Sequence, residues 1–192
     1  LFIEFNSLKE KVGRIKRDFR RDYTKRHPKG SETDYDRVYD VPIGNSVVLG
    51  NPNAKVTIIK WLDFQWPYCA KSVSLIDDIL EKYPNDVKVV IKNFPLSFHK
   101  QAMKAAKYAL AADYQGKYKE MYHKIMENFR ALSKNEDLPL EYARGMGLDM
   151  NQFVKDSESK EIADQINLEM SQLRTSGIPR VAVPKFLVAG KE

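Results

Sequence analysis

The stretch that most constrains this chain is an apolar run that leads through a cysteine-containing turn into a helical pattern. Residues 56–62 (VTIIKWL) are almost continuously apolar, which is typical of a central strand buried on both faces. The turn that follows, residues 63–69 (DFQWPYC), places Pro67 where a helix can begin, because the first helical N–H has no intrahelical partner. A helix N-terminus favours a nearby thiolate. The sequence therefore predicts a strand, a thiol-bearing turn and a helix over residues 56–83.

The phase of the helix after the turn predicts where the cysteine lies. Its apolar residues recur at spacings of 4, 3, 4 and 3, which puts them on one face: Cys69, Val73, Ile76, Leu80 and Tyr83. This phase places Cys69 on the buried face and leaves Trp66 facing outward. Burial disfavours the thiolate that the helix N-terminus favours, and we expect burial to dominate.

The rest of the chain predicts a mixed fold. Residues 41–54 indicate a short strand and a turn, and residues 87–94 a strand parallel to the first through a right-handed crossover. Residues 99–176 have helical patterns almost throughout, and Asp149 is a candidate N-cap. Residues 180–191 predict a last strand and the start of a turn. Pro184 within that strand pattern indicates an edge position or special geometry.

The N-terminal segment is predicted to be separate. Residues 1–26 form an amphipathic helix with apolar residues at heptad spacing up to Phe19, and residues 27–45 form a linker. Two interpretations of the helix remain open: it packs on its own domain, or residues 1–19 form an oligomerisation stalk. Its basic residues suit either a solvated face or attraction to an anionic membrane surface.

Five features together resemble the DsbA-like branch of the thioredoxin superfamily. They are residues 49–56 (LGNPNAKV), the cysteine turn, residues 93–99 (NFPLSFH), the helical segment and Val183–Pro184. The resemblance implies an α/β thioredoxin-like fold with a core over residues 46–98 and 177–192. It also implies a helical insertion over residues 99–176, between the second central strand and the last strand. A cis peptide bond is expected before Pro184, opposite the cysteine turn.

The turn departs from the family pattern at one position. The family turn carries two cysteines, and Trp66 stands where the resemblance places the first, nucleophilic one. Cys69 matches the second and is the candidate catalytic residue that remains. Thiol–disulfide exchange needs a thiolate that reaches a substrate sulfur, and this turn offers no exposed attacker. Whether the chain is an active enzyme is therefore open.

Both turn residues have alternative interpretations. Cys69 is an inert core residue, a reactive single thiol, or a thiol that pairs with another chain. Trp66 either fills the space of the lost cysteine or is an aromatic anchor for polypeptides. In the second case the substrate-binding surface would also include these residues: Phe64, Pro67, Tyr68, Val183 and Pro184.

Two functions follow from the resemblance. The first is a thiol-disulfide oxidoreductase or isomerase of the bacterial cell envelope whose degenerate turn lacks full redox activity. The second is a redox-silent chaperone or scaffold that binds peptides at the same surface. A glutathione-binding relative of the kappa-class transferases is disfavoured, because serine is expected in the turn where Trp66 stands. Expected partners are unfolded or cysteine-containing polypeptides, an envelope redox partner, and further copies of the chain.

Composition limits the remaining classes. The 192 residues are 43% apolar, enough for a core, and the formal net charge is +6. One cysteine excludes an intramolecular disulfide, and the three histidines lack metal-ligand spacing, so neither metal nor cofactor is expected. No nucleic-acid-binding module accompanies the basic residues. We expect a periplasmic or otherwise extracytoplasmic location, with an anchor upstream of Leu1 as one option.

Overall fold

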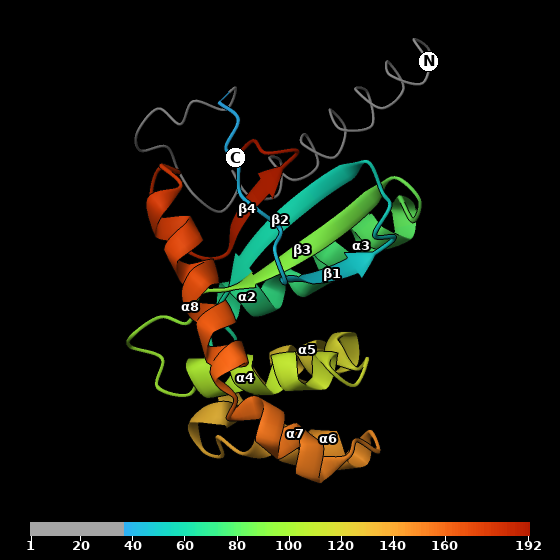
Figure 1. The fold of residues 1–192 in the computed structure, drawn as a ribbon, viewed down its shortest axis with the longest axis vertical. Helices are drawn as coiled ribbons and strands as arrows, with labels where there is room; N and C mark the ends of the chain where they lie inside the picture. The colour runs from blue at the N-terminus through green and yellow to red at the C-terminus, as the bar shows by residue number, and fades with distance from the viewer. Residues whose placement is uncertain (1–36) are drawn as a thin grey trace.

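The computed structural model describes residues 37–192, which form a four-stranded sheet with helices packed against it and a block of helices at one end (Figure 1). The elements, in chain order, are β1 (Val47–Gly50), β2 (Val56–Leu62), α2 (Pro67–Lys71), α3 (Val73–Lys82), β3 (Val87–Asn93), α4 (Ala102–Asp113), α5 (Tyr118–Glu127), the 3₁₀ helix η1 (Phe129–Ser133), α6 (Leu138–Gly145), α7 (Met150–Ser157), α8 (Lys160–Thr175) and β4 (Lys185–Val188). The predicted α/β thioredoxin-like fold with a helical insertion is confirmed.

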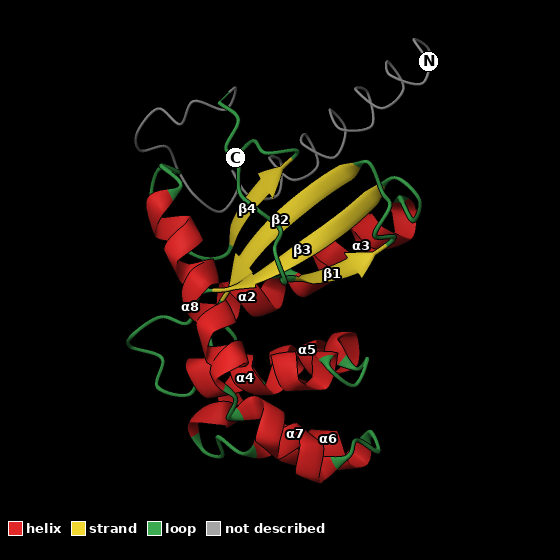
Figure 2. Cartoon of the chain, in the orientation of Figure 1, coloured by secondary structure: helices red, strands yellow, loops and turns green. Residues whose placement is uncertain are grey.

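The sheet has the strand order β1-β3-β2-β4 (Figure 2). The central strands β2 and β3 are parallel, as the right-handed crossover predicted, and both outer strands pair antiparallel. Strand β4, which follows Pro184, lies at an edge of the described sheet. Successive side chains of β2 point to opposite faces: Lys60 bonds Tyr122 of α5, and the Trp61 indole donates to the backbone of α8.

The single helix predicted from Pro67 to Tyr83 is wrong in one respect, because Ser72 divides it into α2 and α3. The Ser72 hydroxyl donates to the Cys69 carbonyl at 2.7 Å, and this local bond competes with regular helical bonding. The break shifts the buried face. Cys69 and Ile76 remain buried as predicted, but Val73 and Leu80 are only half-buried.

All helices from α4 to α8 lie within residues 99–176, the segment predicted to be helical. The α4 helix is rich in alanine, and its small side chains are buried where it packs against α5, α6, α7 and α8. Asp149 caps α7 as predicted, accepting bonds from the backbone N–H groups of Asn151 and Gln152. No helix within residues 37–192 is both long and apolar enough to cross a bilayer.

The predicted last strand differs from the observed one, and the predicted N-terminal segment lies mostly outside the residues that the structure describes. The last strand is shorter than residues 180–191, because Arg180 has a φ of 53° and strand pairing begins only at Lys185. The predicted N-terminal helix lies outside the described residues, as does most of the linker. The described end of the linker packs on the domain: Tyr39 is buried and its N–H donates to Gly190 at 2.7 Å.

A buried polar network ties α8 to the sheet. The Glu169 carboxylate accepts hydrogen bonds from the backbone and side chain of Asn93 and from the Ser46 hydroxyl. Ser46 in turn accepts a bond from the Lys92 ammonium group at 2.9 Å. A buried charge is tolerated only when it is hydrogen-bonded and compensated, and this carboxylate is both. The network therefore fixes the position of α8 against β3.

We predict that Glu169→Gln lowers the free energy of unfolding by about 3 kcal/mol, because an amide cannot accept all of these bonds and Lys92 loses its compensating charge. Urea unfolding followed by circular dichroism measures the change. Glu161→Gln, an exposed position on the same helix, is the matched control and should cost less than about 1 kcal/mol. Equal losses in the two variants would contradict the role of the network.

Candidate functional site at the cysteine turn

Cys69 lies in the first turn of α2, immediately behind the end of β2, and has 0% of its surface exposed. Its sulfur accepts the backbone N–H of Asp63 at 3.4 Å. Burial raises the pKa of Cys69 to about 12, although the Lys60 charge and the Asp63 N–H act in the opposite direction. The prediction that burial outweighs the effects that favour a thiolate at Cys69 is confirmed. This thiol is neutral at physiological pH and has no direct contact with solvent.

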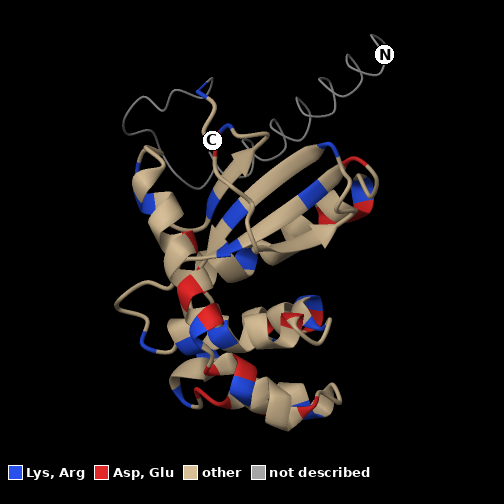
Figure 3. Cartoon of the chain, viewed as in Figure 1, with Lys and Arg blue, Asp and Glu red and all other residues tan. Residues whose placement is uncertain are grey.

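Lys60 is the buried cation of the site, and sequence reasoning missed it. Lysines occur on both central strands (Figure 3), but Lys60 is fully buried and donates from Nζ to the Tyr122 hydroxyl at 2.8 Å. Burial lowers the pKa of Lys60 to about 8, while the nearby Cys69 and Asp77 raise it less. The available signal was a lysine inside a strand that the sequence predicted to be buried on both faces.

Asp63 joins the turn to the loop between β3 and α4. Its carboxylate is buried and accepts the backbone N–H groups of Gln65 at 2.6 Å and Leu96 at 2.7 Å. The Nδ1 atom of His99 lies 3.0 Å from the same carboxylate. A second link runs beside it, because Gln65 exchanges two hydrogen bonds with Gln101 at the start of α4. The turn and the loop are therefore held as one unit.

An aromatic cluster covers the outer side of the turn. The half-buried Trp66 ring lies 5.4 Å from the ring of Tyr68, 6.4 Å from Phe98 and 5.5 Å from His99. Tyr68 is 44% exposed and Phe98 is 66% exposed. We call these four residues the aromatic cluster. Sequence reasoning placed Trp66 and Tyr68 on this surface but missed Phe98 and His99, which come from a different loop.

The remaining residues predicted for the surface are divided between surface and core. Phe64 is only 1% exposed and packs edge-on against Tyr122 at 6.1 Å, so its predicted place on the surface is wrong. Pro67 is half-buried at the start of α2. The Val183–Pro184 peptide bond is cis, with Val183 buried and Pro184 half-buried. Because Trp61 pairs with Lys185, Pro184 lies beside the end of β2 from which the turn departs.

The described part of the chain holds no cluster of metal-binding side chains, and no histidine other than His99 lies near the turn. Within residues 37–192 no three His, Cys, Asp or Glu side chains come together as a metal site. His123, the other described histidine, lies away from the turn and bonds Asp77 of α3 at 2.8 Å. The site therefore consists of a buried thiol, a buried lysine, an aspartate–histidine pair and exposed aromatic rings.

The fold, the cysteine turn and the helical insertion together define the class of protein as thioredoxin-like. The family model described as thioredoxin matches residues 43–192, so the chain belongs to the thioredoxin family. A thioredoxin-like oxidoreductase from Silicibacter pomeroyi DSS-3 is 32% identical, with a TM-score of 0.66 over 76% of this chain and 80% of that one.

Two more distant structures share the fold. Wolbachia pipientis α-DsbA1 is 21% identical, with a TM-score of 0.67 over 77% of this chain and 76% of that one. Oxidised BdbD from Bacillus subtilis is 18% identical, with a TM-score of 0.66 over 80% of this chain and 86% of that one.

The curated relatives that match are much longer than this chain. A protein named Na(+)/H(+) antiporter NhaA from Herminiimonas arsenicoxydans is 26% identical over 160 residues, which are 82% of this chain and 25% of that protein. Na(+)/H(+) antiporter NhaA 1 from Mycolicibacterium gilvum (strain PYR-GCK) is 32% identical over 110 residues, which are 57% of this chain and 18% of that protein. The chain thus spans a quarter or less of these relatives.

We predict that the burial of Lys60 makes stability depend on pH. Its pKa is about 8 when folded and near 10.5 when unfolded, so between these values the unfolded chain binds more protons and stability rises with pH. Lys60→Met removes this dependence. The stability of the variant relative to wild type should therefore fall by about 1 kcal/mol between pH 7 and pH 9.

Urea unfolding at the two pH values measures this difference. Both proteins keep the buried Cys69, so the titration of the thiol cancels in the comparison. Lys88→Met on β3 is the matched control, because the Lys88 ammonium group is exposed where it bonds the Pro52 carbonyl. A pH-independent difference between Lys60→Met and wild type would show that Lys60 stays charged in the fold.

Proposed function

We propose that this chain binds unfolded or extended polypeptides on the surface around the cysteine turn and does not exchange disulfides efficiently. One observation carries the proposal: the Cys69 thiol is fully buried with a raised pKa, while Tyr68 and Phe98 of the aromatic cluster are exposed. The family supplies the scaffold of a disulfide oxidoreductase, and the residues present at the turn favour binding over exchange.

The chemistry of exchange supports the first half of the proposal. Exchange proceeds by attack of a thiolate on a disulfide sulfur, and a thiol with a pKa of about 12 has about one thiolate in 10⁵ at pH 7. The sulfur of Cys69 also has no exposed surface through which a substrate could approach. Trp66, as the N-cap residue of α2, stands at the position where the resemblance places the attacking cysteine.

The aromatic cluster supports the second half. Large aromatic side chains are frequent anchors of binding surfaces, since they offer much apolar area with few rotatable bonds. The rings of Tyr68 and Phe98 extend this area on both sides of Trp66, and the Lys71 ammonium group lies 5.5 Å from the Tyr68 ring. Such a surface suits an extended segment that presents apolar side chains without requiring one sequence.

The second candidate is an envelope oxidoreductase or isomerase that acts on cysteine-containing polypeptides through Cys69 alone, together with a redox partner. The charge of Lys60 and the bond from the Asp63 N–H favour it, because both stabilise a thiolate at Cys69. The turn would have to open before this thiolate could meet a substrate.

Two further parts of the proposal rest on the sequence. The DsbA-like resemblance implies a periplasmic or otherwise extracytoplasmic location, with membrane anchoring upstream of Leu1 as one arrangement. The heptad pattern of residues 1–19 supports a homo-oligomer, which would place several aromatic clusters on one particle.

Trp66→Ser should weaken polypeptide binding at least tenfold, because it removes the central ring of the aromatic cluster. The probe is fluorescein-labelled insulin B chain, reduced and carboxymethylated so that no disulfide can form, and its fluorescence anisotropy gives the Kd. Tyr114→Ser is the matched control, an exposed aromatic at the far end of α4. Binding that is absent in wild type, or unchanged in Trp66→Ser, would overturn the proposed function.

Trp66→Cys should create disulfide exchange, because it supplies an attacking thiol at the start of α2 with Cys69 behind it. The measurement is insulin reduction by dithiothreitol, followed as turbidity. Wild type and Cys69→Ala should both stay at the uncatalysed rate, and adding Cys69→Ala to Trp66→Cys should slow turnover. Wild-type turnover that is lost in Cys69→Ala would instead establish the second candidate.

A further inference from the structure

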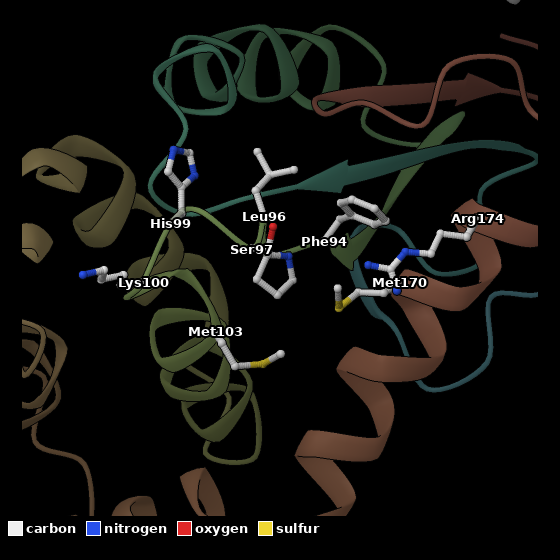
Figure 4. A pocket seen from close by; sticks show the side chains of 9 residues that line it. Phe94, Leu96, Ser97, His99, Lys100, Met103, Met170 and Arg174 are labelled. Carbon is white, nitrogen blue, oxygen red and sulfur yellow. The ribbon is translucent and has the colours of Figure 1, made fainter.

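A cavity of about 370 Å³ lies on the other side of the loop that carries His99, between that loop and the helices α4 and α8 (Figure 4). It is lined by Phe94, Pro95, Leu96, Ser97, His99, Lys100, Met103, Met170 and Arg174. This volume is near the lower end of the range for ligand sites, and it suits one large side chain and its neighbours.

The walls of the cavity are apolar and adaptable. Met103 projects from α4 and Met170 from α8, and the two side chains point toward each other across the cavity (Figure 4). Methionine is flexible and polarizable, so it accommodates apolar groups of different shapes. The lining therefore favours an apolar side chain without selecting one shape.

The charge at the rim of the cavity is positive and uncompensated. Arg174 is exposed, and its guanidinium group lies 5.2 Å from the centre of the Phe94 ring, which holds it beside the cavity. No aspartate or glutamate lines the cavity, and within residues 37–192 no carboxylate pairs with Arg174. Lys100 also belongs to the lining, but its side chain points away (Figure 4). Arg174 is thus placed to receive an anionic group.

The cavity and the aromatic cluster share one loop. His99 belongs to the lining of the cavity, and its ring lies 5.5 Å from that of Trp66. Leu96, also in the lining, donates its N–H to Asp63 of the turn. The aromatic cluster and the cavity therefore lie on two sides of one loop, and a segment that crosses this loop would contact both.

We propose that this cavity is a specificity subsite for polypeptides that carry an acidic residue next to a large apolar one. The apolar side chain enters between Met103 and Met170, and the neighbouring carboxylate pairs with Arg174. Arginine suits this role because its planar guanidinium group binds carboxylates through two parallel hydrogen bonds. The inference rests on the proposed function and adds the class of segment that the surface selects.

The test uses fluorescein-labelled twelve-residue peptides with a common host sequence that contains one tryptophan. One peptide carries Leu-Asp at its centre, the second Leu-Asn and the third Ala-Asp, and anisotropy gives each Kd at low and at high salt. We expect wild type to bind the Leu-Asp peptide at least fivefold more tightly than either of the others. The advantage of Asp over Asn should shrink at high salt, because a pair at an exposed rim is screened.

Arg174→Gln should abolish the preference for Asp over Asn and leave the preference for Leu over Ala. Arg144→Gln, an exposed arginine on α6, is the matched control and should change neither. Because Arg174 is exposed, the variant is expected to fold, and its urea midpoint checks this.

The outcomes separate this inference from the function on which it rests. If all three peptides bind equally and Trp66→Ser weakens all of them, the subsite is overturned and the binding function stands. A preference for Asp that survives Arg174→Gln also overturns the subsite. If no peptide binds wild type at any salt concentration, both the proposed function and the subsite are overturned.

Discussion

The carboxylate of Asp63 is the contact on which the site depends. It accepts hydrogen bonds from the backbone of its own turn and from the loop after β3, and it lies beside His99, while the Asp63 N–H meets the sulfur of Cys69. One buried residue thus connects the turn, the thiol and the loop, through its carboxylate to the turn and the loop and through its backbone N–H to the thiol. Without a carboxylate here, part-buried backbone N–H groups in two segments would lose their acceptor, which would lower the free energy of unfolding. The positions of the aromatic cluster and of the cavity follow from this connection.

Burial and mutual attraction act in opposite directions on the two ionisable groups in the interior of the site. Burial raises the pKa of Cys69 and lowers that of Lys60, so both groups shift toward their neutral forms. Their mutual attraction acts against this shift and would stabilise the charged pair if water reached it. While the site is closed, the thiol of Cys69 is neutral and unreactive. The charge of Lys60 beside it would stabilise a thiolate if the site opened. The thioredoxin fold is thus present here with a turn whose single sulfur is buried.

The aromatic cluster and the cavity meet at the loop of residues 94–99. The aromatic cluster lies on one side of this loop and the methionine-lined cavity on the other, and His99 belongs to both. The aromatic cluster offers apolar area without strong selectivity, and the cavity adds the positive charge of Arg174. Under the proposed function, the aromatic cluster would anchor a polypeptide and the cavity would add specificity, a division that is common at binding surfaces.

The sequence by itself determined the order of strands and helices, the family, and the burial of Cys69, because each depends on a local pattern: an apolar run, a helical phase or a turn motif. Tertiary structure decided which side chains share a surface. Phe64, two residues before Trp66, turns inward against Tyr122, while Phe98 and His99 reach the turn from a loop far away in the chain. The break at Ser72 and the buried bond of Lys60 to Tyr122 were equally hidden. The physical reason is that periodicity states which residues lie on one face of an element, whereas only the packing of distant elements decides whether that face is covered and by which groups.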